Sequence, residues 1–120
     1  MRAEAIKLGQ ALLEHHLAMT TKSPPHAVKR LVPSRYTIPY SKLCERAGTI
    51  HILRMVGSFL GEVADWCAAQ GYPPLNSLAV NADTGIPGEG YDGAGGFKIV
   101  DWPTEVEQCI RFVGYPRRMP

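Results

Sequence analysis

The sequence predicts a small α+β protein of one domain, residues 1–120, with a helix–turn–helix at its centre. Two observations lead to this prediction. Segments with helical periodicity occupy both ends and the middle of the chain, while the second half is rich in glycine and carries short extended segments. A chain of 120 residues with 45% hydrophobic content is long enough for one core but not for two. We expect a winged-helix-like centre, a short β-hairpin and a C-terminal helix.

Residues 1–21 are expected to form an amphipathic helix, because Ile6, Leu13 and Leu17 fall on one helical stripe and the prolines that follow Ser23 end it. Residues 22–39 hold four prolines, several basic side chains and no acid. Prolines exclude a long regular element, so this segment is either a solvated linker or a basic arm. In the second case, Lys29 and Arg30 would contact phosphates.

Residues 40–71 are predicted to form the helix–turn–helix. A first short helix, Ser41 to Ala47, would have Ser41 as its N-cap and end at Gly48. Thr49 would cap a second helix from Ile50 to about Gln70, on which Gly57 and Gly61 leave a small face for another backbone. On the exposed side of this pair we expect Lys42, Arg46, Thr49, His51 and Arg54.

Residues 72–100 are predicted to form a strand and a glycine-rich loop. The strand would run from Leu75 to Asn81, followed by a turn and by residues 85–96, which hold six of the twelve glycines. Residues 97–100 are a possible second strand. Thr104 and Glu107 form a capping-box pattern, which predicts a last helix through Val113 within residues 101–120.

No residue pattern in the chain predicts a catalytic centre, a metal site or a cofactor. His15 and His16 are adjacent, so on a helix they point about 100° apart and cannot share a metal ion with good geometry. The three cysteines lack CxxC spacing and are typical of buried thiols in a reducing cytoplasm; they are Cys44, Cys67 and Cys109. The carboxylates Glu62, Asp65, Glu105 and Glu107 are expected to be solvated helix positions.

Nothing in the sequence predicts a membrane segment or a signal peptide. No apolar run approaches the roughly 18 residues that span a bilayer. The first residues alternate charged and apolar side chains, unlike a signal peptide. We therefore expect a cytoplasmic protein.

From Ile38 to Gly57 the chain, IPYSKLCERAGTIHILRMVG, resembles the helix–turn–helix of the O6-alkylguanine-DNA alkyltransferases and their non-enzymatic alkyltransferase-like relatives. The matching positions are Tyr40, Ala47-Gly48, Arg54 and Val56-Gly57. The resemblance implies that Arg54 enters the base stack as a finger and that Tyr40 helps to rotate the target phosphate. It also implies that the glycine–tyrosine loop around Gly90 and Tyr91 lines a base pocket.

The same resemblance implies that dealkylation is absent. Where the family carries its Pro-Cys-His-Arg centre, this chain has Leu75-Asn76-Ser77-Leu78-Ala79, without cysteine, histidine or arginine. A chain built like an alkyltransferase would then bind DNA without repairing it.

Three hypotheses for function follow. The first is a non-enzymatic module that binds double-stranded DNA through the second helix and the basic arm. The second is a small phage or mobile-element protein that binds and inhibits a host protein, because an irregular loop surface suits a protein partner. The third is a small enzyme with a site formed by polar side chains that would converge in one pocket: Tyr40, Arg54, Asn76, Ser77, Asn81 and Tyr91.

Overall fold

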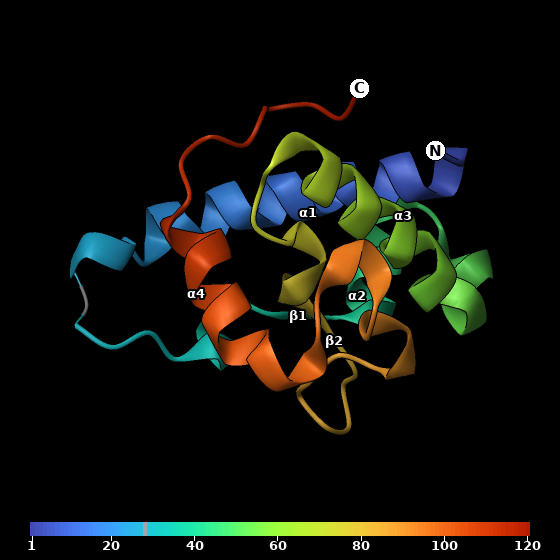
Figure 1. Ribbon diagram of the computed structural model, residues 1–120. Helices are drawn as coiled ribbons and strands as arrows, with labels where there is room; N and C mark the ends of the chain where they lie inside the picture. Colours follow the sequence, from blue (N-terminus) through green and yellow to red (C-terminus); the bar gives the residue numbers. More distant parts are fainter. Residues whose placement is uncertain (28) are drawn as a thin grey trace.

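The longest element of the protein is the first helix, α1, which runs from Ala3 to Lys22 in a computed structural model that describes residues 1–27 and 29–120. The helix predicted for residues 1–21 is therefore confirmed. Leu8 and Leu12 are fully buried on its inner side, as its periodicity requires. In Figure 1, α1 extends across the upper half of the molecule, above α2, α4 and the strands.

The basic segment after α1 contains two single-turn 3-10 helices, Pro25–Ala27 and Pro33–Arg35. Tyr36, near the end of this segment, connects the segment to the end of α1. The side chain of Tyr36 is buried, and its hydroxyl donates a hydrogen bond to the Ser23 carbonyl at 2.9 Å. Position 28 of the predicted arm lies outside the described residues, while Lys29 and Arg30 are exposed.

The next elements are strand β1, Ile38–Pro39, and helix α2, Tyr40–Ala47. Gly48 ends α2 with a φ of 70°, as predicted, since glycine adopts the left-handed conformation without a Cβ penalty. The predicted N-cap was wrong: Pro39 holds that position and Ser41 lies inside the helix. The fixed φ of Pro39 and its extended backbone let the strand pass directly into the helix.

The predicted second helix is divided. Residues Ile50–Met55 form a 3-10 helix, and the α-helix α3 runs only from Val56 to Gln70, where Gly71 ends it. Three β-branched residues and Gly57 lower the α-helix propensity of this stretch. Thr49 is fully buried and its hydroxyl lies 3.5 Å from the Cys44 carbonyl, so its expected place on the exposed side was also wrong.

The sheet consists of two short parallel strands rather than a hairpin. Strand β2, Ala79–Val80, pairs with β1 in a register that opposes Ile38 to Ala79. Parallel strands need a crossover, and α2 and α3 supply it between β1 and β2. The predicted β-hairpin is therefore corrected, and the predicted strand over residues 75–81 is reduced to β2, because Leu75–Leu78 form a 3-10 helix.

The glycine-rich region contains three further 3-10 helices, Glu89–Tyr91, Ala94–Gly96 and Ile99–Asp101. The second strand expected at residues 97–100 is therefore absent from this described part of the chain. Helix α4 runs from Trp102 to Arg111, so Thr104 is not its cap. Starting the helix at Trp102 places Pro103 in the first turn, where its missing N–H costs no helical hydrogen bond.

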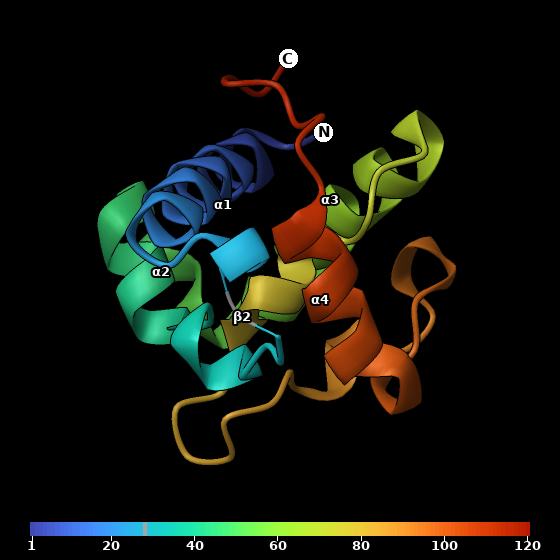
Figure 2. The same ribbon diagram turned by 90° about the vertical axis from the view of Figure 1, so that its left-hand side faces the viewer.

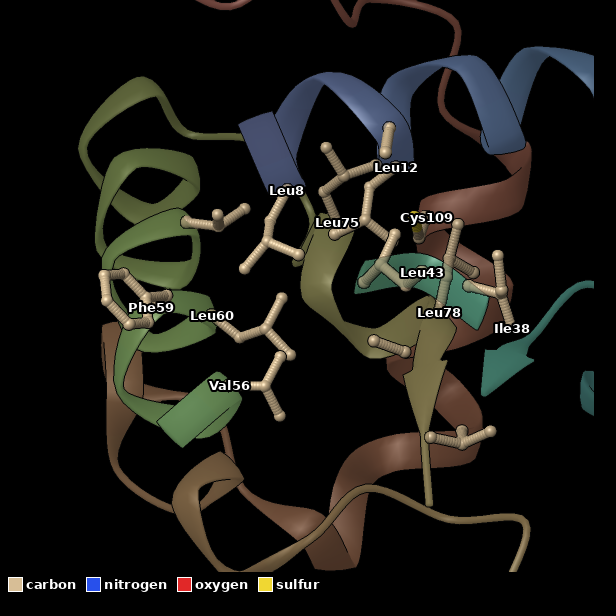
Figure 3. Packing of buried hydrophobic residues seen from close by; sticks show 14 of the residues in the cluster. Leu8, Leu12, Ile38, Leu43, Val56, Phe59, Leu60, Leu75, Leu78 and Cys109 are labelled. Carbon is tan, nitrogen blue, oxygen red and sulfur yellow. The ribbon is translucent and has the colours of Figure 1, made fainter. Parts of the chain in front are cut away.

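One hydrophobic cluster joins these elements. Figure 3 shows Leu8 and Leu12 of α1 facing Leu75 and Leu60, which belong to the 3-10 helix before β2 and to α3. In Figure 2, α1 and α2 lie on one side and α4 on the other, with β2 between them. The result is a mostly helical α+β fold whose interior holds the residues just before β2. This arrangement places Asn76 beside the cavity described below.

Candidate functional site

A cavity of about 210 Å³ lies where the 3-10 helix Ile50–Met55, α3 and the glycine-rich loop meet. Its walls contain four side chains singled out from the sequence, Tyr40, Arg54, Asn76 and Tyr91. Leu60, Glu89 and four glycines complete the lining, and these glycines are Gly57, Gly61, Gly88 and Gly90. Residues far apart in the sequence thus converge on one small concave site.

Close contact between α3 and the loop shapes this cavity. A Cβ atom at Gly90 would lie 3.3 Å from the Cα atom of Gly57, and one at Gly61 would lie 3.8 Å from the Cβ of Ala94. The small face predicted on the second helix is confirmed, because the loop backbone packs directly on it. Asp65 strengthens the contact by accepting a hydrogen bond from the Gly95 N–H at 2.8 Å.

Tyr40 stands at the first position of α2 and reaches across to the loop. Its hydroxyl oxygen accepts a hydrogen bond from the Gly88 N–H at 2.6 Å. Because that bond occupies a lone pair, the hydroxyl proton is left to donate to a group in the cavity. Burial raises the pKa of Tyr40 above its ordinary value, against the lowering effect of the Gly88 hydrogen bond, so the phenol stays protonated at neutral pH.

Tyr91 also lines the cavity and is held by Glu105 of α4. The Tyr91 hydroxyl donates a hydrogen bond to Glu105 Oε1, and both side chains are buried. Burial, followed by the Glu105 contact, raises the pKa of Tyr91 well above its ordinary value. Glu105 was therefore wrongly expected to be solvated. Its place between Trp102, Val106 and Cys109 on the buried stripe of α4 is the sequence signal that could have revealed this.

Asn76 contributes a buried amide to the cavity. Its side chain is 3% exposed, and its Oδ1 atom has no hydrogen-bond partner among the described residues. Buried amide oxygens are normally hydrogen-bonded, so Asn76 has an unused acceptor at the cavity lining. The short 3-10 helix Leu75–Leu78 presents it from the core side of the site.

Arg54 lies at the rim of the cavity. Its side chain is exposed, and no carboxylate within the described part of the chain lies in ion-pair distance of its guanidinium. The planar cation is therefore available for an anion or for stacking against an aromatic ring.

Two residues predicted for the pocket lie elsewhere. Ser77 is buried, but it does not line the cavity, and its carbonyl accepts a hydrogen bond from Trp102 Nε1 at 2.8 Å. Asn81 accepts a hydrogen bond from the Asp83 N–H at 2.8 Å and so stabilises the turn that follows β2. The Asn81 side chain therefore has the role of a turn residue, while the buried Ser77 hydroxyl has no hydrogen-bond partner among the described residues.

The predicted surface cations are dispersed. Lys42 is exposed on α2, and His51 lies 3.9 Å from Glu4. Arg46 lies in a separate groove of about 380 Å³ between α1 and α2, together with Lys7. These positions add positive charge on and around α2, but they do not line the cavity that contains Arg54.

Two further histidines, His15 and His16, and the three cysteines are buried. His15 Nε2 and His16 Nε2 lie 2.7 Å and 2.8 Å from the carbonyl oxygens of Tyr36 and Cys109. No group of three or more potential metal ligands occurs within the described ranges. Burial raises the pKa of the Cys67 thiol to about 11 and that of Cys109 to about 12, so both are inert at neutral pH.

Comparison with known protein families, with curated proteins and with solved structures finds no match for this chain. Within the described residues, no helix combines the length and the apolar character needed to cross a membrane. A fold by itself does not define a function, which depends on the chemistry of the site.

Proposed function

We propose that this protein binds double-stranded DNA without catalysing a reaction on it, and that Arg54 enters the base stack. The observation that carries this proposal is the position of Arg54, an exposed cation that has no ion-pair partner among the described residues. It lies at the rim of a small cavity lined by two tyrosines and an amide. An arginine inserted between base pairs would occupy the space of a base that has moved into such a cavity.

The dimensions of the cavity support a ligand of one ring system. About 210 Å³ lies below the 300–1,000 Å³ of common small-molecule sites and corresponds to roughly seven water molecules. The aromatic ring of Tyr91 and the side chain of Leu60 offer apolar surface. The hydroxyl of Tyr40 and the amide of Asn76 offer hydrogen bonds to the edge of a base.

The chemistry of the lining supports binding rather than covalent repair. No cysteine lines the cavity, and burial raises the pKa of Cys44 as well as the values of the other two thiols. The resemblance to alkyltransferase-like proteins implies the same conclusion, since residues 75–79 contain neither the cysteine nor the histidine and arginine of that family's centre.

Exposed cations outside the cavity would contact the DNA backbone. Lys42 and Arg46 on α2, with Lys29 and Arg30 after α1, are exposed, and no carboxylate within the described ranges lies in ion-pair distance of them. Phosphate contacts of this kind fix the position of a protein on the duplex and do not select a sequence.

The proposal is tested with Arg54→Ala and a matched control, Arg118→Ala, which removes an exposed cation from the C-terminal tail. We expect Arg54→Ala to weaken binding to a fluorescent 20-base-pair duplex by about 1–3 kcal/mol at low salt, because the stacked cation is lost. Arg118→Ala should change binding by less than about 0.5 kcal/mol. Fluorescence anisotropy gives the affinities, and circular dichroism checks that both variants fold. Equal affinities for the two variants would sink the role given to Arg54.

A further inference from the structure

A second concave surface lies away from the proposed DNA site. It is a groove of about 460 Å³ between the C-terminal half of α1, the first prolines after it, the end of α4 and the C-terminal tail. None of its lining residues lines the cavity that contains Arg54. In Figure 1 the tail passes above α1 after leaving α4. Gln10 fixes it there by donating to the Arg117 carbonyl at 3.1 Å and accepting from the Met119 N–H at 2.9 Å.

Apolar residues form more than half of the groove lining, and two of these side chains are unusually exposed. Leu17 is 58% exposed and Val113 is 98% exposed. Isolated surface apolar residues need no explanation, but these two share one concave surface with Ile110, Phe112 and Tyr115. Tyr115 is held rigidly, because its hydroxyl donates to the Pro73 carbonyl at 2.6 Å and its ring packs edge-on against His16.

The polar side chains of the groove include charges of both signs, Arg117 and Glu14. Arg117 lies at the tail side and has no carboxylate in ion-pair distance within the described part of the chain. Glu14 lies on α1, where Gln10 Nε2 donates to its carboxylate at 3.2 Å. His26 adds an exposed imidazole near the prolines. A mainly apolar pocket with a few polar groups is the usual form of a small-molecule site, and an arginine selects a planar carboxylate.

We propose that this groove binds a small apolar carboxylate, with its hydrocarbon chain against Leu17, Ile110 and Phe112 and its carboxylate on Arg117. A volume of 460 Å³ corresponds to about fifteen water-sized groups, which is the size of a medium-length acyl chain. Burying the chain covers the exposed apolar surface of α1 and the tail. The guanidinium supplies a charge-assisted hydrogen bond to the head group.

The test uses octanoate on the full-length protein, with octylammonium as a ligand of equal length and opposite charge. Amide chemical shifts in a ¹H–¹⁵N NMR titration report both the site and the affinity. We expect octanoate to shift residues of the groove in a saturable way, with a dissociation constant on the order of 1 mM for ten non-hydrogen atoms. Octylammonium should bind at least about tenfold more weakly, because Arg117 repels it and the Glu14 carboxylate already accepts a hydrogen bond from Gln10.

Variants separate the two parts of the site. Arg117→Gln should weaken octanoate binding about fivefold or more, while the neighbouring control Arg118→Gln leaves it unchanged, since Arg118 does not line the groove. Leu17→Gln should also weaken binding, and the exposed position of Leu17 keeps the fold intact. The proposal is overturned by equal binding of octanoate and octylammonium, by shifts confined to other surfaces, or by no saturable shift up to about 10 mM.

Discussion

At the scale of single residues, His15 and His16 connect α1 to the rest of the molecule through backbone carbonyls. Each ring lies within hydrogen-bond distance of one carbonyl, at Tyr36 and at Cys109 respectively. Burial lowers the pKa of both histidines, and nearby Arg46 lowers that of His15 further, so the folded protein holds both rings in the neutral form. The unfolded chain retains the ordinary value of about 6.5.

Stability should therefore decrease in mild acid. Below about pH 6.5 the unfolded chain binds more protons than the folded one, so the free energy of unfolding falls as pH falls. We expect a loss of up to about 1.4 kcal/mol per pH unit for each histidine, measured by urea denaturation between pH 7.5 and 5.5. His15→Gln and His16→Gln should each reduce this slope, while His26→Gln, at an exposed position, should not. A flat stability profile for the wild type would contradict this explanation.

The candidate site shows which single residues the sequence could identify. Tyr40, Arg54 and Tyr91 were selected by chemical type and by a family resemblance, and the fold brings them to one cavity. Glu105 was missed, because a carboxylate near a helix start is usually solvated and its partner lies fourteen residues away. Ser77 was expected in the pocket but does not line it, although its neighbour Asn76 does, because adjacent residues on a 3-10 helix point in different directions.

At the scale of elements, contact between α3 and the loop that follows β2 determines the shape of the cavity. Gly95 has a φ of 60°, and a Cβ atom there would lie 2.6 Å from the backbone oxygen of Ala64. Gly71 also has a left-handed φ, of 74°, but has open space around it. A Cβ atom at Gly71 would therefore meet only the strain of a left-handed φ, while a Cβ atom at Gly95 would meet that strain and a steric clash.

Alanine substitutions at these two glycines should differ in effect. Gly71→Ala should cost about 1–2 kcal/mol of stability, because alanine is strained in the left-handed region. Gly95→Ala should cost more, since the same strain is joined by a clash with the α3 backbone that cannot be relieved by a side-chain rotation. Urea denaturation of the two variants measures the difference. Equal losses would show that the loop can move away from α3.

Helix ends at glycine were predictable from the sequence, and the course of the chain between them was less so. Gly48 ends α2 as expected, and α3 ends at Gln70, the predicted last residue, with Gly71 as its C-cap. The break at Met55 depends on how Ile52 and Val56 pack into the core, which local propensity does not determine. The parallel pairing of β1 and β2 depends on the crossover between them, so short strands alone gave no reason to prefer it over a hairpin.

At the scale of the whole molecule, the cavity beside Arg54 and the groove beside Arg117 share no lining residue. The formal net charge of +2 is small, so affinity for DNA must come from the arrangement of cations rather than from their total. Lys42 on α2 and Arg54 at the cavity have different expected roles, the first on a phosphate and the second between bases. Salt dependence distinguishes these roles.

The most direct test of DNA binding is the affinity for a duplex measured across a series of salt concentrations. The logarithm of the association constant should fall linearly with the logarithm of salt concentration, and Lys42→Ala should reduce the slope by about 0.9. Arg54→Ala should lower affinity at every salt concentration, with a smaller change of slope. The absence of duplex binding at about 50 mM salt, or an affinity that does not depend on salt, would contradict the account.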